Sequence, residues 1–167
     1  SKMNIFSKIY NYYLNKSKPE SISLPSDLDI KKLHEFIAPI NSGRVIKVYD
    51  GDTITVASKI PGLKKSPIYK FSIRLNGIDC PEMRTHNDDE KEIAIKARDA
   101  LSDRIMHKDV FLKNIKTEKY GRLLCDVYID DDNLNEWMIQ KRYAVSYNGG
   151  TKISPESWKN YHENNII

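Results

Sequence analysis

The 167-residue sequence lacks several features that mark specialised classes of protein. It has only two cysteines, Cys80 and Cys125, which lie far apart and outside metal-like spacing, so neither a disulfide framework nor a zinc site is indicated. No stretch approaches the roughly 18 consecutive apolar residues that a membrane span requires. The first residues lack the continuous apolar core and the small-residue cleavage site of a secretory signal. We therefore expect an intracellular, cytoplasmic protein without a transmembrane segment.

The sequence also lacks a strong excess of charge of either sign. Lys and Arg total 27 against 23 Asp and Glu, which gives a net charge of +4 and only weakly favours a polyanionic partner. Hydrophobic residues at 40% and charged residues at 30% are typical of a globular chain and exclude a disordered one. The length fits one domain with short extensions, and since nothing suggests an obligate oligomer we expect a monomer.

Residues 1–42 have the composition of an N-terminal extension. Apolar residues recur at helical spacing over residues 3–20, with lysines on the remaining face, which predicts a short basic amphipathic helix. Packing on the domain is the favoured role for it, and weak contact of residues 3–18 with a membrane surface is the alternative. After a Pro- and Ser-containing linker, Ser26 is placed to cap a second helix from Asp27 to about Ile37.

Residues 43–167 have the pattern of a small barrel with helices. β-branched runs at 44–49 and 53–57 flank the turn signal Asp50-Gly51-Asp52, which predicts a hairpin. Three further strands are expected at 69–76, 110–115 and 122–129. Helices are expected after Asn87, where apolar residues recur as far as Ile105, over 134–141, and from a Ser154-Pro155 cap to about Glu163. Five strands with about three helices indicate an α+β domain built on a closed or partly closed five-stranded barrel.

Three short clusters combine charged residues with sharp backbone turns: Asp50-Gly51-Asp52-Thr53, the stretch from Arg74 to Glu82, and Glu118-Lys119-Tyr120-Gly121-Arg122. Each has an ordinary structural explanation when it is taken alone. The first is a common β-turn sequence, the second could hold a structural ion pair, and the third could be a charged hairpin tip.

Taken together, the clusters supply the groups that phosphodiester hydrolysis requires. Asp52 and Asp79 offer hard oxygen ligands for a divalent cation, and Ca²⁺ binds such carboxylates readily. Arg74 and Arg122 can grip a phosphate and stabilise the charge that builds on it in the transition state. Glu82 is left to orient or deprotonate the attacking water.

In this order and spacing the three clusters resemble the thermonuclease family, the staphylococcal nuclease-like proteins. Residues 45–53, 74–82 and 118–122 carry the resemblance, and Asn133-Leu134-Asn135 followed by Tyr143-Ala144 resembles the family's next helix. The resemblance implies an OB-fold barrel and a Ca²⁺-dependent nuclease. It further implies cleavage of DNA and RNA at the 5′-oxygen side of the phosphate, which leaves 3′-phosphate ends.

The resemblance also assigns roles to individual positions. It implies that Asp52, Asp79 and the backbone carbonyl of Cys80 bind Ca²⁺. Arg74, Glu82 and Arg122 match the catalytic residues, and Lys119 and Tyr120 match residues that contact the terminal phosphate of a bound nucleotide.

The sequence departs from the family pattern at several points: Glu118 stands where the family has Asp, residues 83–90 show no resemblance, and the aromatic residues after Ala144 do not align cleanly with the family pattern. The alternative function is a non-catalytic OB-fold module that binds nucleic acid or protein. Such modules typically lack one or more of the catalytic residues, so the complete set favours a hydrolase.

Overall fold

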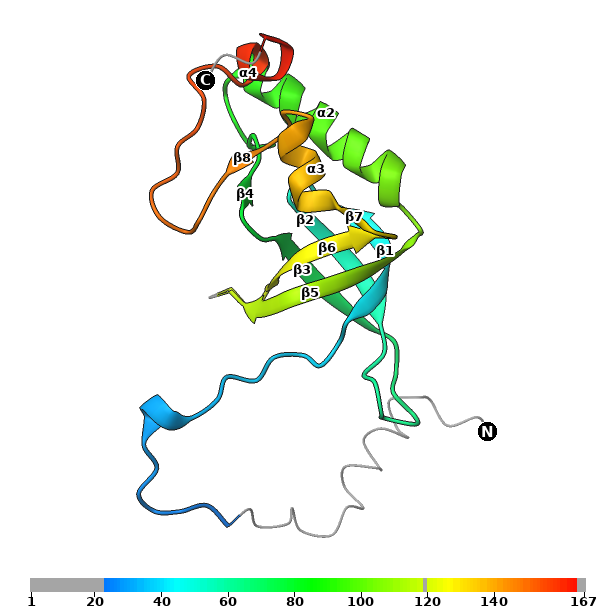
Figure 1. Cartoon of the computed structure of the whole chain (residues 1–167), viewed down its shortest axis with the longest axis vertical. Coiled ribbons are helices and arrows are strands. Elements are labelled where there is room, and N and C mark those ends of the chain that lie inside the picture. The colour runs from blue at the N-terminus through cyan, green and yellow to red at the C-terminus, as the bar shows by residue number, and fades with distance from the viewer. Residues whose placement is uncertain (1–22, 119, 165–167) are drawn as a thin grey trace, which may run out of the picture. The chain divides into compact units, whose positions relative to one another are not determined.

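The structure, a computed structural model, describes residues 23–118 and 120–164 (Figure 1). The amphipathic helix predicted over 3–20 and the predicted substrate-binding Lys119 lie outside these residues. The chain divides after His34 into two units, and the second unit, Glu35–Ile167, contains the barrel and its helices. None of the described helices is long and apolar enough to cross a membrane.

The helix predicted over residues 27–37 is wrong. The described part of this segment forms only a single 3-10 turn, η1 (Ile30–Lys32), and Asp29 rather than Ser26 caps it by accepting a hydrogen bond from the Lys31 N–H at 3.0 Å. The apolar residues of the predicted helix face remain exposed: Leu28, Leu33, Phe36 and Ile37. Because a short helix is marginal in water unless such a face is buried, spacing alone is a poor guide here.

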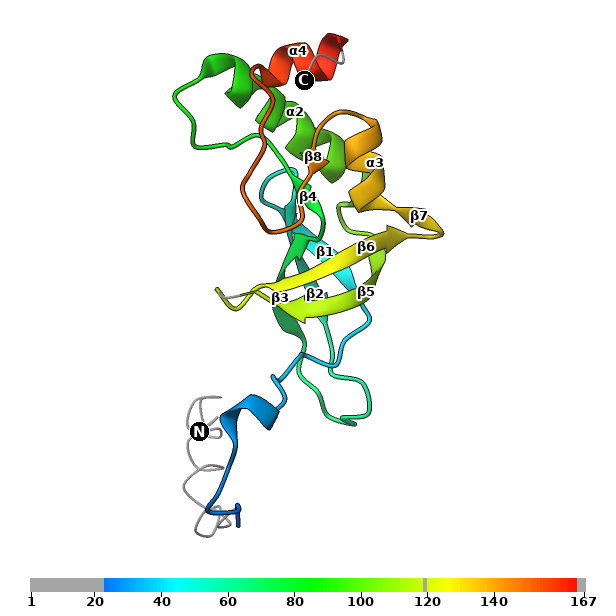
Figure 2. The same ribbon diagram turned by 60° about the vertical axis from the view of Figure 1, so that its left-hand side comes forward.

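Five strands form the predicted barrel (Figures 1 and 2). They are β1 (Ser42–Val48), β2 (Thr53–Ser58), β3 (Tyr69–Leu75), β5 (Asp109–Thr117) and β6 (Leu123–Ile129). Their order is β3-β2-β1-β5-β6, and a parallel pairing between β3 and β6 closes the sheet on itself. The short strand β7 (Asp132–Asn133) pairs with β6, while β4 (Ile78–Asp79) pairs separately with β8 (Val145–Ser146).

Alternation of apolar residues along the strands fills the barrel. The side chains that face its interior are fully buried and include Val45, Ile54, Val56, Ile73, Val110 and Val127. The β1–β2 hairpin predicted around the Asp50-Gly51-Asp52 turn is confirmed, with Val48 opposite Ile54. The predicted five-stranded α+β fold is therefore confirmed, and the strand ends differ from the predicted ones by only a few residues.

Three α-helices accompany the barrel in the described residues: α2 (Asp88–Ile105), α3 (Leu134–Gln140) and α4 (Trp158–Asn164). Helix α2 begins at its predicted cap, because the Asn87 side chain accepts a hydrogen bond from the Glu90 N–H at 3.1 Å. Its apolar face packs into the core through Ala97, Leu101 and Ile105. Figure 2 shows α2, α3 and α4 gathered at one end of the barrel.

The last helix begins later than predicted. Ser154 does not cap it. Instead α4 starts at Trp158, and the Ser157 hydroxyl accepts a hydrogen bond from the Asn160 N–H at 3.2 Å. The reason is packing. Trp158 and Tyr161 are the apolar residues that dock this helix onto Ile93 of α2, and they occur only from position 158 on.

Candidate functional site

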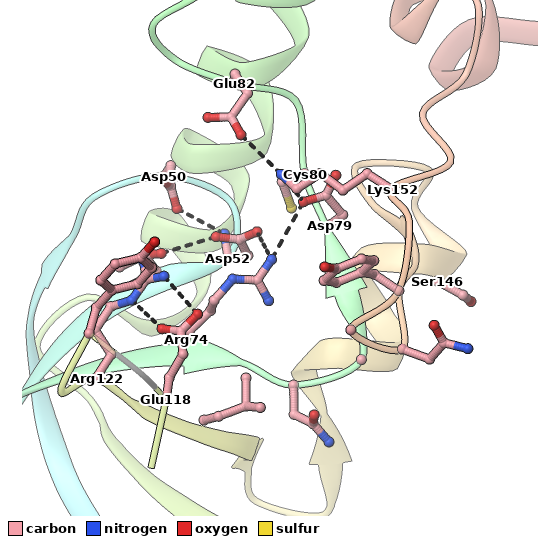
Figure 3. Close-up of a pocket in the computed structure, with 18 of the residues that line it drawn as sticks. Asp50, Asp52, Arg74, Asp79, Cys80, Glu82, Glu118, Arg122, Ser146 and Lys152 are labelled. Atoms are coloured by element: carbon pink, nitrogen blue, oxygen red, sulfur yellow. Dashed lines mark hydrogen bonds and ion pairs between the residues drawn. The ribbon is translucent and has the colours of Figure 1, made fainter. Parts of the chain in front are cut away.

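The three sequence clusters meet in one open pocket of about 1060 Å³ beside the barrel (Figure 3). Every residue predicted for the site and described by the structure lines this pocket: Asp52, Arg74, Asp79, Cys80, Glu82, Tyr120 and Arg122. They come from the β1–β2 turn, strand β3, the segment around β4 and the β5–β6 hairpin, which the closed barrel places side by side.

The β1–β2 turn sets the position of Asp52. The Asp50 carboxylate accepts a hydrogen bond from the Asp52 N–H at 3.1 Å, so Asp50 shapes the turn, as expected from the sequence. Gly51 lets the turn approach β4, because a Cβ at this position would lie 2.8 Å from the Cys80 Sγ. A Cβ here would require the turn or the Cys80 side chain to shift.

Arg74 lies between two buried carboxylates. Its Nη2 is 3.2 Å from the Asp52 Oδ2 and 3.5 Å from the Asp79 Oδ1. The exposed fractions are 9% for Arg74, 8% for Asp52 and 4% for Asp79. Arg74 thus has two anionic partners on this face of the strand.

Burial disfavours the charged form of the Asp52 carboxylate. Burial raises the pKa of Asp52 to about 6, although the neighbouring Arg74 acts in the opposite direction. The Arg74 guanidinium therefore does not fully offset the cost of burying the Asp52 carboxylate, and a cation placed beside Asp52 would favour its charged form.

The residues present fit a divalent cation of the hard type. Two aspartate carboxylates reach the same nitrogen of Arg74, and carboxylate and carbonyl oxygens are the donors that Ca²⁺ prefers. No group of three or more His, Cys, Asp or Glu side chains converges as a metal site among the described residues. A set of two carboxylates and one backbone carbonyl, as predicted for Asp52, Asp79 and Cys80, would leave the remaining positions to water and substrate.

The two cysteines offer no thiolate chemistry. Burial raises the pKa of the Cys80 thiol well above its usual range and raises the pKa of Cys125 to about 12. Both thiols are therefore neutral near pH 7. The contribution open to Cys80 is its backbone carbonyl, and its side chain packs against Gly51.

Arg122 stands on the opposite side of the pocket from β4, on the β5–β6 hairpin. Gly121 adopts a φ of 77°, which allows the tight turn that precedes Arg122. The guanidinium forms two hydrogen bonds to Glu118, from Nε to Oε2 at 2.6 Å and from Nη2 to Oε1 at 3.0 Å. This hydrogen bonding raises the pKa of Arg122, and it holds the fork-shaped cation at the pocket wall (Figure 3).

Glu82 carries its carboxylate on an exposed loop that α2 holds in place. The Glu82 N–H donates a hydrogen bond to the Glu90 Oε1 at 3.0 Å, and the Thr85 hydroxyl donates to the Glu90 Oε2 at 2.7 Å. The side chain of Glu82 is 65% exposed and reaches the pocket. The first turn of α2 thus holds the backbone of Glu82 and the side chain of Thr85 in place.

Sequence reasoning did not predict roles for Tyr147 and Lys152, two pocket residues that contact predicted site residues. Both lie on the connection from β8 to α4. The Tyr147 ring centroid is 5.8 Å from the Arg74 Cζ, and the Lys152 Nζ is 2.8 Å from the Asp79 Oδ1. No spacing in the sequence shows that this connection folds back over the site.

Comparison with known proteins places the chain in a family. The family model described as "Staphylococcal nuclease homologue" matches residues 72–164, more than half of the chain. An uncharacterized endonuclease of Haemophilus influenzae is 33% identical over 107 residues, which cover 64% of this chain and 53% of that protein. A probable endonuclease of Schizosaccharomyces pombe is 30% identical over 132 residues, covering 66% of this chain and 57% of that protein.

A third relative, protein ParB of Escherichia coli, is 29% identical over 124 residues that cover 68% of this chain and 62% of the relative. The chain thus spans only about half to three fifths of the length of these relatives. The family match confirms the resemblance that the three sequence clusters predicted. The chain belongs to the staphylococcal nuclease homologue family.

Proposed function

We propose that this chain is a Ca²⁺-dependent nuclease that hydrolyses phosphodiester bonds of DNA, RNA or both. The observation that carries the proposal is the convergence of Arg74, Arg122 and Glu82 with two buried aspartates on one open pocket. Membership of the family and relatives named as endonucleases support it. The proposed cleavage breaks the bond between phosphorus and the 5′-oxygen and leaves a 3′-phosphate.

Each predicted site residue has a proposed role in the hydrolysis. Asp52, Asp79 and the Cys80 carbonyl would hold Ca²⁺, and when bound the ion supplies positive charge beside the scissile phosphate. The Arg74 guanidinium lies next to these ligands, where it can hydrogen bond a phosphate oxygen.

Arg122 would bind the same phosphate from the hairpin side. In this structure its fork is satisfied by Glu118, so a phosphate must compete with that carboxylate or share the guanidinium with it. As negative charge builds on the phosphate in the transition state, the two arginines stabilise it more than the ground state, which is how they would accelerate the reaction.

Glu82 would orient or deprotonate the attacking water. Its carboxylate is exposed enough to contact bulk water and is held near the buried aspartates. Attack forms one new oxygen–phosphorus bond and breaks the bond to the 5′-oxygen, which leaves as a hydroxyl after taking up a proton. Tyr120, which lines the pocket, and Lys119, its neighbour in the sequence, would contact the terminal phosphate of the substrate.

Cleavage assays test this proposal. Single-stranded and double-stranded DNA and RNA should be incubated with the purified chain, either with Ca²⁺ or with a chelator. We expect cleavage only with Ca²⁺, and product ends that a polymerase extends only after phosphatase treatment, as a 3′-phosphate requires. Salt-sensitive DNA binding without cleavage would contradict the proposal and favour the non-catalytic binding module instead. The monomeric state, the intracellular location and membrane contact by residues 3–18 stay predictions.

A further inference from the structure

Lys152 brings a further cationic side chain into the pocket, beside the predicted metal ligands. Its Nζ is 2.8 Å from the Asp79 Oδ1 and 3.2 Å from the Glu82 Oε1 (Figure 3). The Asp79 side chain is only 5% exposed, whereas the Lys152 side chain is 48% exposed. The ammonium thus reaches in from solvent to a carboxylate that is buried.

Lys152 contacts the same atom that would bind a metal ion. The Asp79 Oδ1 already lies 3.5 Å from the Arg74 Nη2 and 2.8 Å from the Lys152 Nζ. Calcium ligands lie about 2.3–2.6 Å from the ion. If a divalent cation bound this carboxylate while the Lys152 ammonium kept its present place, two positive charges would lie in close contact. Their repulsion is unfavourable beside a carboxylate as buried as that of Asp79.

From this geometry we infer that Lys152 is a tethered counter-ion of Asp79 and Glu82, and that a divalent cation binds the pocket by displacing it. The inference rests on the proposed Ca²⁺ site. It adds that the chain's own lysine weakens Ca²⁺ binding and so raises the Ca²⁺ concentration at which the site fills.

The surroundings of Lys152 allow such an exchange. Residues 148–154 form no helix or strand and are exposed, so the long side chain can turn into water without disturbing the barrel. Arg74 is the less mobile cation, because it is buried and also donates to the Leu75 carbonyl at 3.3 Å. Of these two cations, Lys152 is the one that can leave at small cost.

Calcium titration of the full chain tests the exchange. CaCl₂ is titrated calorimetrically into the wild type, Lys152→Met and Lys152→Arg, with Lys159→Met as the control. Lys159 also pairs with carboxylates, Asp89 and Glu92, but does not line the pocket. Since partly exposed ion pairs contribute modestly, we expect Lys152→Met to bind Ca²⁺ about threefold to fivefold more tightly. Lys152→Arg and Lys159→Met should stay close to the wild type.

A second readout uses stability instead of affinity. The Ca²⁺-induced rise in the unfolding temperature should be larger for Lys152→Met than for the wild type, because the metal-free variant has lost a counter-ion that Ca²⁺ replaces. Lys152→Gln is a second neutral variant with the same expectation, should the methionine variant fold poorly.

The outcomes separate this inference from the proposed function. If the wild type binds Ca²⁺ and the neutral variants bind it equally or more weakly, Lys152 does not compete and the inference is wrong, while the nuclease proposal stands. If neither the wild type nor the neutral variants bind Ca²⁺, the metal site itself is wrong and both fall. Tighter binding by the neutral variants alone supports the exchange.

Discussion

The buried position of Arg74 makes its replacement the most informative test of the site's electrostatics. Replacing it with methionine keeps the length of the side chain and removes the charge that lies between Asp52 and Asp79. Removing one partner of a buried ion pair costs about 3–5 kcal/mol. Lys152 remains beside Asp79 as a partial replacement, so we expect the lower end of that range, about 3 kcal/mol.

For a chain of this length, a decrease of about 3 kcal/mol in the free energy of unfolding corresponds to a fall of roughly 6–12 °C in the unfolding temperature. The assay is urea unfolding at pH 7 in the presence of a chelator, followed by circular dichroism. Added Ca²⁺ should restore part of the loss, because the ion supplies positive charge to the same two carboxylates. Turnover should stay low in either condition, since the phosphate contact is gone.

Arg44→Met is the matched control. Arg44 also lies on a barrel strand and pairs with an aspartate. It forms two hydrogen bonds to Asp109, but both side chains are exposed. Exposed pairs of this kind contribute little to stability, so this variant should unfold like the wild type. Equal losses for Arg44→Met and Arg74→Met, or no loss for either, would refute the argument that burial makes the Arg74 cluster important.

Three further predictions concern the residues around the cluster. Arg122→Ala should lower turnover on the order of a hundredfold with a much smaller effect on stability, and a near-normal rate would remove Arg122 from the proposed phosphate contacts. Because the folded pKa of Asp52 is raised from 3.8 to about 6, the folded state binds more protons than the unfolded state between these values, so stability falls as the pH rises. In chelator, the free energy of unfolding of the wild type should fall by on the order of 3 kcal/mol relative to that of Asp52→Asn as the pH rises from about 4 to about 7. A difference between the two proteins that is independent of pH in urea titrations would contradict this. Glu90→Ala should speed hydrogen exchange of the Glu82 amide and lower turnover several-fold, whereas unchanged exchange would show that Glu90 does not hold this loop.

The sequence was sufficient to predict the barrel and the convergence of its charged clusters. The reason is that the turn around Gly51, the alternation of Ile73 and Leu75 and the apolar face of α2 are strong local signals that tertiary packing reinforces. The second cluster could hold an ion pair, and its Arg74 pairs with two carboxylates. The family match then agreed with the resemblance carried by the same clusters.

Other features depend on contacts that no local pattern reports. The segment over residues 27–37 has helical spacing, but its apolar side chains are exposed, so only η1 forms. Helix α4 starts where Trp158 meets Ile93, a contact between residues far apart in the chain. Lys152 reaches Asp79 for the same kind of reason, since the path of an irregular loop is set by what it packs against.

The measurement that tests the central claim most directly is Ca²⁺-dependent cleavage of DNA by the wild type beside Glu82→Gln. This substitution keeps the size of the side chain and removes its charge, and Glu156→Gln, an exposed glutamate outside the described pocket lining, is the control. We predict that the wild type and the control cleave DNA only when Ca²⁺ is present, and that their rates are similar. The cleavage rate of Glu82→Gln should be lower by at least about a hundredfold. Cleavage by Glu82→Gln at the wild-type rate would contradict the account, as would no cleavage by the wild type under any of these conditions.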